Sequence, residues 1–169
     1  MSRSTLALGL LSLALVAVQL NVFSELRLLG VVIMAVWLWA FCVGLVSSHG
    51  AALVASGIAG GYVDAHAATP FGLNALTCVG LAYLGSRLAR EGVGDLHGAA
   101  IWMAPLLGGC VGLLTPLVFA IAATFVFDTA PWQGSLPASM VVNAIAFAVA
   151  ARPLARLVEV ATGESGSRR

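Results

Sequence analysis

Asp64 is the residue of this sequence with the clearest chemical potential, because it is an acid that closes a glycine-rich apolar stretch beginning at Ser56 (SGIAGGYVD). A carboxylate at the centre of a bilayer costs roughly 2.5–3.5 kcal/mol on insertion scales, so such residues usually have a function. Two interpretations are open. Asp64 is either a solvated acid at a membrane interface that ends a helix, or a specific polar contact to a partner protein.

Ser56 is the best candidate for a nucleophile, since it precedes Gly57 in a way that is similar to the serine of intramembrane proteases. The glycine that precedes the serine in the G-x-S-G motif of that family is replaced here by Val54-Ala55. The possible bases are His49, His66 and His97, all of which we expect in loops. The sequence has no H-E-x-x-H motif and no glycine-rich loop before a lysine. We therefore expect no enzyme, no cofactor and no catalytic residue.

The three cysteines do not indicate a disulfide framework or a metal site. Cys42, Cys78 and Cys110 each lie inside an apolar run, their number is odd, and no C-x-x-C spacing occurs. We expect them to be small packing residues.

Pairs of small residues at a spacing of four suggest close helix packing. Gly57 and Gly61 form one G-x-x-x-G pair, with Gly60 beside them, and Gly108 and Gly112 form a second. Such faces let helix backbones approach closely in lipid. The partner of each face is either another helix of the same chain or a helix of another protein.

Composition places these residues in a membrane protein. Of 169 residues, 60 % are hydrophobic and only 9 % are charged, whereas a soluble domain carries about 25 % charged residues. The apolar residues lie in runs near the ~20 residues that cross a bilayer. With a net charge of +1 and no basic surface, we expect no nucleic-acid partner.

Six apolar runs predict an all-α integral membrane domain over residues 1–162, with a disordered cytoplasmic tail at 163–169. The third run appears too short for a simple crossing, Pro70 suits the first turn of the next helix, and Pro105 and Pro116 should kink the fifth. The expected spans are Thr5–Phe23, Leu28–Val46, Ala51–Val63, Phe71–Leu88, Gly98–Phe127 and Pro137–Ala151.

Arginine placement predicts the topology. If all six runs cross and both termini are cytoplasmic, only Arg27 lies outside. This distribution follows the positive-inside rule, and it collapses if the short third run does not cross. The inside arginines would be Arg3, Arg87, Arg90, Arg152, Arg156, Arg168 and Arg169.

A transporter is the main alternative. A small six-helix bundle with a broken, glycine-rich segment could enclose a vitamin-sized ligand, as the substrate-capture components of energy-coupling-factor transporters do. Few polar or aromatic residues are available to line such a pocket. The candidates are Tyr62, Tyr83, Asn74 and Asn143, with Trp37 and Trp39 as rings that could stack on a ligand.

The glycine-rich stretch resembles the rod-shape-determining protein MreD family of bacteria. Members are short and hydrophobic, with a G-x-x-x-G-x-x-x-D outline and a (P/T)-(L/F)-G turn into the next helix. The sequence here is GIAGGYVD over residues 57–64, followed by Pro70-Phe71-Gly72. It departs from the family after Gly30, where Val31-Val32 replace the usual Pro-Asp.

This resemblance implies a non-catalytic, multi-pass protein of the bacterial plasma membrane that binds MreC. The wider assembly contains RodA, its class B penicillin-binding partner and, on the cytoplasmic side, MreB. The implied fold is similar to that of the energy-coupling-factor components. We expect the glycine faces to pack within the bundle, and the Asp64–Gly72 loop to present a surface to the transmembrane helix and outer base of MreC.

Overall fold

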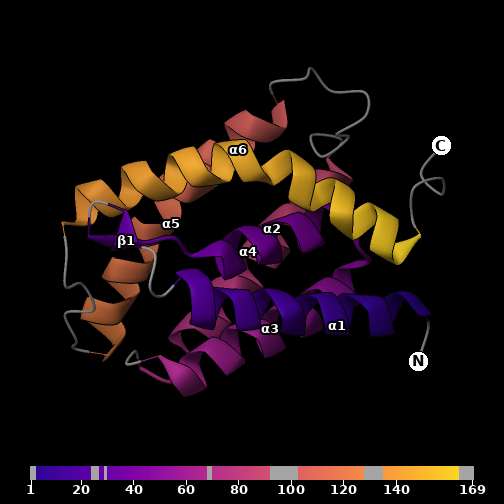
Figure 1. Cartoon of the computed structure of the whole chain (residues 1–169), viewed down its shortest axis with the longest axis horizontal. Coiled ribbons are helices and arrows are strands. Elements are labelled where there is room, and N and C mark those ends of the chain that lie inside the picture. Colours follow the sequence, from indigo (N-terminus) through magenta and orange to yellow (C-terminus); the bar gives the residue numbers. More distant parts are fainter. Residues whose placement is uncertain are drawn as a thin grey trace.

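The protein forms six α-helices, as a computed structural model shows for residues 3–23, 27–28, 30–67, 70–91, 103–127 and 135–163 (Figure 1). The all-α prediction with six helices is thereby confirmed, with a two-stranded hairpin as an addition. In chain order the elements are α1 (Arg3–Val18), the π-helix η1 (Gln19–Phe23), β1 (Arg27–Leu28), β2 (Val31–Val32), α2 (Ala35–Val46), α3 (His49–His66), α4 (Leu73–Arg90), α5 (Met103–Phe127) and α6 (Leu136–Thr162).

Helix α2 is the centre of the fold. Every one of its 12 residues is buried, including Trp37, Trp39 and Phe41. Helices α1, α3, α4, α5 and α6 all contact it. A helix that is apolar on all faces must be surrounded by other helices or by lipid, and here the other helices surround it.

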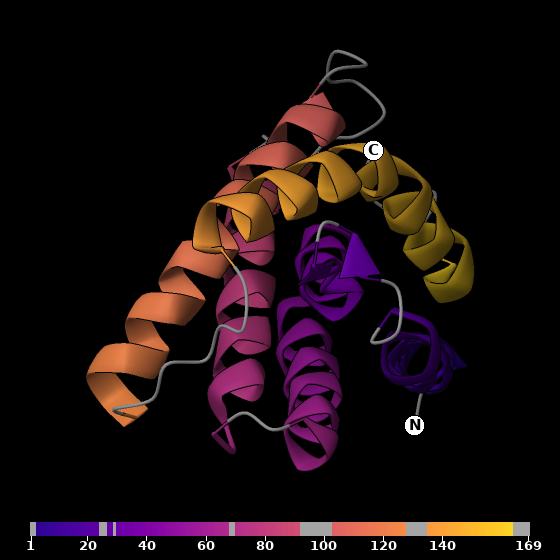
Figure 2. The ribbon, with the colours of Figure 1, turned by 60° about the vertical axis from the view of Figure 1, so that its left-hand side comes forward.

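Helix α6 links the two sides of the bundle. Figure 2 shows it arching from α5, along which it packs, toward α1. Pro153 lies inside α6 and removes one backbone hydrogen bond, which favours bending there. Helix α6 continues beyond the expected end of the sixth span at Ala151, through Arg152 and Arg156, and Gly163 ends it in the left-handed conformation. Residues 164–169 of the predicted tail lie outside the described residues.

The second helix is shorter than predicted, because α2 begins at Ala35 and not at Leu28. Its first residues form the hairpin, in which Arg27 pairs with Val32, and Gly30 has a φ of +78°. At about 1.5 Å per residue, α2 spans roughly 18 Å, well below the ~30 Å hydrocarbon thickness. The described residues of this run that precede α2 are not helical.

The third span is longer than predicted. Helix α3 has 18 residues and not about 13, because it begins at His49 instead of Ala51 and remains helical through Asp64 as far as His66. The prediction that Asp64 begins a loop was therefore wrong, as was the prediction of a short third helix.

Two of the prolines named in the sequence prediction lie before α4 and inside α5. Pro70 precedes α4 by three residues instead of lying in its first turn. Helix α5 runs without a break through Pro116, and the first residues expected in the fifth run, 98–102, lie outside the described residues.

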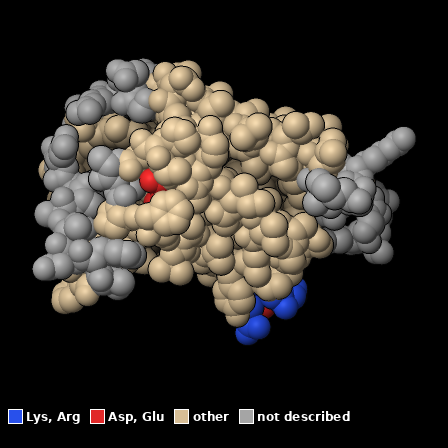
Figure 3. Space-filling view, turned by 90° about the horizontal axis from the view of Figure 1, so that it is seen from below, with Lys and Arg blue, Asp and Glu red and all other residues tan. Residues whose placement is uncertain are grey.

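The described surface is largely apolar. Three helical segments, at Leu6–Phe23, Pro105–Phe125 and Leu136–Thr162, are long and apolar enough to cross a membrane. In Figure 3 the arginine atoms gather at one edge of the face, and most of the remaining described surface there is uncharged. The start of α1 and the end of α6 lie at the same end of the long axis (Figure 1). This arrangement is compatible with a membrane protein.

Candidate functional site

Asp64 lies in the last turn of α3 and is buried, with 4 % of its surface exposed. Its Oδ1 accepts hydrogen bonds from the backbone N–H (2.9 Å) and the side-chain Nδ2 (3.0 Å) of Asn74. Its Oδ2 accepts from the N–H groups of Gly72 (3.0 Å) and Ala75 (2.9 Å). These donors form the first turn of α4, where free N–H groups and the helix dipole favour an anion. Asp64 is thus a cap supplied to α4 by α3.

Two glycines make this cap possible. Gly72 has a φ of +96°, a conformation that residues with a side chain rarely adopt, and it directs the chain into α4. Gly60, one turn before Asp64, faces the start of α4, where a Cβ atom would come within 2.6 Å of the Asn74 carbonyl oxygen and the Ala75 Cα. The missing side chain allows the carboxylate to reach the N–H groups of α4.

The hydrogen bonds continue from Asp64 into the central helix. Asn74 Oδ1 accepts from Trp37 Nε1 (3.2 Å), and the Trp37 ring packs on Phe119 with ring centroids 5.0 Å apart. Trp37 and Asn74 are both fully buried. The chain of contacts therefore connects α3, α4, α2 and α5.

The expectation of a solvated or docking Asp64 does not fit this geometry. Both carboxylate oxygens are occupied by α4, so the residue ends no helix at an interface and offers little surface to a partner. Two residues of the following turn are more exposed than Asp64. Phe71 is 76 % exposed, and Pro70 is half-buried.

Most of the predicted packing glycines contact helices of the same chain. A Cβ at Gly57 would lie 3.2 Å from Val79 on α4, and one at Gly108 would lie 2.6 Å from the Phe147 carbonyl oxygen on α6. Gly112 approaches the Asn143 carbonyl of α6 even more closely. Gly61 differs, because a Cβ there would meet nothing within 4 Å.

The sequence did not predict a further close contact, between α2 and α4. Gly44 of α2 packs on the Ala82 backbone of α4, and Gly85 packs back on the Phe41 carbonyl oxygen of α2, which a Cβ would approach to 2.5 Å. Neither glycine belongs to a G-x-x-x-G pair. A lone glycine within a run of tryptophan and phenylalanine is the only signal that the sequence offers for this contact.

A second polar contact holds the extended segment that precedes α2. The Met34 N–H donates to Asn143 Oδ1 (3.0 Å), and Gln19 Nε2 donates to the Ile33 carbonyl oxygen (3.0 Å). Asn143 is fully buried and also donates to the Ser139 carbonyl oxygen (2.9 Å). Side chains of η1 and α6 thus satisfy backbone groups that lie outside any helix, as a nonpolar environment requires.

Replacing Asn143 by alanine should lower the free energy of unfolding by about 1–3 kcal/mol, because the Met34 N–H would lose its acceptor at a partly buried position and the fully buried Asn143 amide would be lost. A denaturant titration of the purified protein in detergent measures this change. Asn21→Ala is the matched control, since Asn21 is exposed and should change stability by less than about 0.5 kcal/mol. Equal effects of the two substitutions would contradict the role of Asn143.

The arginines expected to set the topology lie in the second halves of two helices. Arg87 and Arg90 are in the last turn of α4, and Arg87 Nε lies 3.1 Å from Glu91 Oε1. Arg152 and Arg156 lie in the second half of α6. The expectation that all four are cytoplasmic remains a prediction.

The predicted pocket-lining residues do not converge. Asn74 and Asn143 are occupied by the bonds described above, whereas Tyr62 and Tyr83 are exposed on α3 and α4. Trp39 Nε1 donates to Ser12 Oγ (3.0 Å). Ser56 is fully buried, and its hydroxyl has no hydrogen-bond partner among the described residues.

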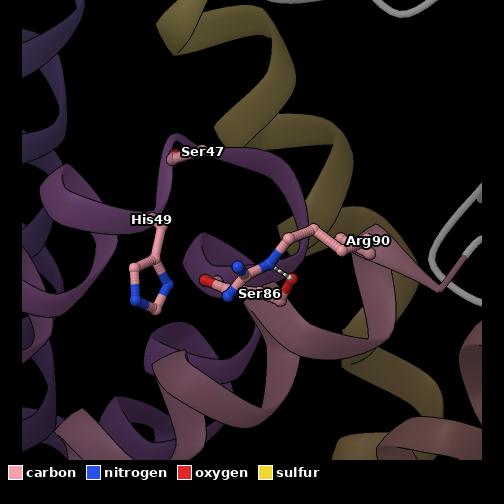
Figure 4. A pocket seen from close by; sticks show the side chains of 6 residues that line it. Ser47, His49, Ser86 and Arg90 are labelled. Atoms are coloured by element: carbon pink, nitrogen blue, oxygen red, sulfur yellow. Dashed lines mark hydrogen bonds between the residues drawn. The ribbon is translucent and has the colours of Figure 1, made fainter.

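A cavity of about 380 Å³ lies instead where α2 ends, α3 begins and α4 ends. Figure 4 shows Ser47, His49, Ser86 and Arg90 around this space. The side chain of Arg90 folds back over α4, where its Nε donates to the Ser86 carbonyl oxygen (3.3 Å). The lining residues are Gly44, Ser47, His49, Ser86, Ala89 and Arg90.

Comparison with models of protein families, with curated proteins and with solved structures gives no match for this chain.

Proposed function

We propose that this chain is a non-catalytic component of the bacterial cell-elongation complex, of the MreD kind, and that it acts by binding MreC. Through MreC it would join RodA, the class B penicillin-binding protein and MreB in organising peptidoglycan synthesis. It would cross the plasma membrane six times with both termini in the cytoplasm. The proposal starts from the resemblance of residues 57–72 to that family.

One observation carries the proposal: the buried polar groups of this stretch make their hydrogen bonds to other groups of the same protein. Asp64 accepts four hydrogen bonds from α4, and Asn74 connects it to Trp37. The glycine-rich stretch therefore builds a rigid α3–α4 pair and leaves its acid unavailable to a substrate. A rigid pair with an apolar outer surface suits a protein that binds other membrane proteins.

The outer surface of this pair is where we place MreC. Phe71 and Leu76, which are 76 % and 62 % exposed, lie at and just after the turn into α4, and Ile58 is exposed on α3. Transmembrane helices associate mainly through close packing of such surfaces. Phe71 belongs to the docking surface expected for the Asp64–Gly72 loop, and in this proposal Leu76 joins it in place of the buried Asp64.

Changing both Phe71 and Leu76 to alanine should weaken co-purification with MreC at least tenfold, while the protein itself stays folded. Loss of about 1.4 kcal/mol of packing across the interface is enough for this factor. The measurement is the amount of MreC retained by tagged protein from membranes in mild detergent, together with cell shape when the variant is the only copy.

The matched control changes Ile145 and Val149 of α6, which are 62 % and 74 % exposed, to alanine. It removes similar apolar surface from another helix and should leave MreC binding and rod shape unchanged. If the Phe71/Leu76 variant also retains MreC, the proposed surface is wrong. If the unaltered protein retains no MreC, the proposed function is wrong.

A further inference from the structure

We propose that the cavity between the end of α2, the start of α3 and the end of α4 is a binding site for a phosphate group. Its lining residues supply two kinds of side-chain donor, the hydroxyls of Ser47 and Ser86 and the guanidinium of Arg90, and α3 begins at the lining residue His49. This site is separate from the Asp64 cap, and it requires no protein partner.

The two hydroxyls are the strongest observation. Ser47 and Ser86 are 3 % and 4 % exposed, they line the cavity, and neither Oγ has a hydrogen-bond partner among the described residues. A buried hydroxyl without a partner costs stability, and most such groups in proteins are paired. A ligand that accepts two hydrogen bonds would satisfy both.

The charge of the site favours an anion. Figure 4 shows the Arg90 guanidinium on the His49 side of α4, beside Ser86. Only its Nε is committed, to the Ser86 carbonyl oxygen, and no acidic partner of Arg90 is found in the described part of the chain. The neighbouring acid, Glu91, pairs with Arg87. A guanidinium that presents several N–H groups matches the oxygens of a phosphate.

The start of α3 adds donors that a cation site would not have. Helix α3 has 18 residues, its cap residue Ser48 makes no side-chain capping bond, and His49 at its first position lines the cavity. The first N–H groups of a helix have no partner inside the helix, and they bind phosphate readily together with the helix dipole. The cavity volume of about 380 Å³ falls in the range of about 300–1,000 Å³ typical of small-molecule sites.

The phosphate can belong to a lipid headgroup or to a soluble molecule, and two probes distinguish these sources. Full-length protein is stripped of lipid in detergent, and its thermal unfolding is followed during titration with inorganic phosphate or with phosphatidylglycerol. Sodium chloride at equal ionic strength and diacylglycerol with the same acyl chains are the respective blanks. A ligand that binds only the folded state raises the unfolding temperature as its concentration rises.

We expect at least one probe to raise the unfolding temperature above its blank. A response to phosphatidylglycerol alone identifies a lipid site, and a response to inorganic phosphate identifies a site open to soluble phosphates. Changing both Ser47 and Ser86 to alanine, or Arg90 to glutamine, should raise the apparent Kd about tenfold or more, because each removes hydrogen bonds to a charged group.

Two controls make the test specific. Ser56→Ala removes another buried hydroxyl that has no partner in the described part of the chain, but this residue does not line the cavity. Arg87→Gln removes the neighbouring arginine. Both should bind like the unaltered protein. Arg90 is exposed, so Arg90→Gln provides a folded variant even if the double serine variant does not fold. If neither probe exceeds its blank, or if Arg90→Gln binds as well as Arg87→Gln, the site is refuted.

Discussion

Replacing Asp64 by alanine should lower the free energy of unfolding by about 3–5 kcal/mol, because several donors that the carboxylate now satisfies would each lose an acceptor at about 1–3 kcal/mol. The substitution leaves the N–H groups of Gly72, Asn74 and Ala75 without their acceptor at the start of α4. It also removes the acceptor of Asn74 Nδ2, in the side chain whose Oδ1 accepts the hydrogen bond from Trp37. Denaturant titration in detergent, followed by tryptophan fluorescence, measures the change.

Asp64→Asn separates charge from shape. Asparagine keeps one oxygen acceptor but turns the second group into a donor that faces N–H groups, so we expect a loss close to that of alanine. Glu91→Gln is the control, since it removes an exposed carboxylate paired with Arg87 and should change stability by less than about 1 kcal/mol. An Asp64→Ala protein as stable as the control would show that α4 does not depend on this cap.

Gly60→Ala should destabilise the protein by about 3 kcal/mol, whereas Gly61→Ala should stabilise it by up to about 1 kcal/mol. At Gly60 the added methyl group would come within 2.6–2.8 Å of backbone atoms of Asn74 and Ala75, which cannot move without separating α3 from α4. At Gly61 the methyl group meets nothing within 4 Å, so the helix gains the propensity of alanine without strain.

The comparison of these two adjacent positions is informative because the same substitution, glycine to alanine, is made at neighbouring residues of the same helix. Stability is measured as for Asp64, and the α3–α4 separation is followed by crosslinking of cysteines introduced at exposed positions on the two helices. Destabilisation of similar size at both positions would mean that α3 presents a different face to α4. A Gly60→Ala effect on MreC binding without a loss of stability would instead assign this glycine to the partner.

The number and order of the helices could be predicted from the sequence, since each apolar run ends in polar or turn residues. The boundaries of α2 and α3 could not. A count of apolar residues assigns the segment from Leu28 to a helix, but its backbone bonds go to Gln19 and Asn143, which are far away in the chain. Such non-local bonds leave no periodic pattern in the segment itself.

Asp64 illustrates the same limit for the candidate site. Its position after a glycine-rich stretch marked it as unusual, but the sequence suggested a solvated acid that ends a helix or a contact to a partner protein. The N–H groups that hold the carboxylate belong to residues 72–75 at the start of the next helix. The two serines of the cavity gave no signal, since a serine at a helix end looks like any cap or turn residue.

The contact between Asn143 and Met34 also has a consequence for synthesis of the protein. These residues are 109 positions apart, so α2 is synthesised long before the residue that completes its start. Until α6 is made, the Met34 amide has no partner from it, and α2 lacks one of the helices that surround it. The chain can therefore acquire its final interior only after the last helix has been made, and the packing of α6 is the step that closes the bundle.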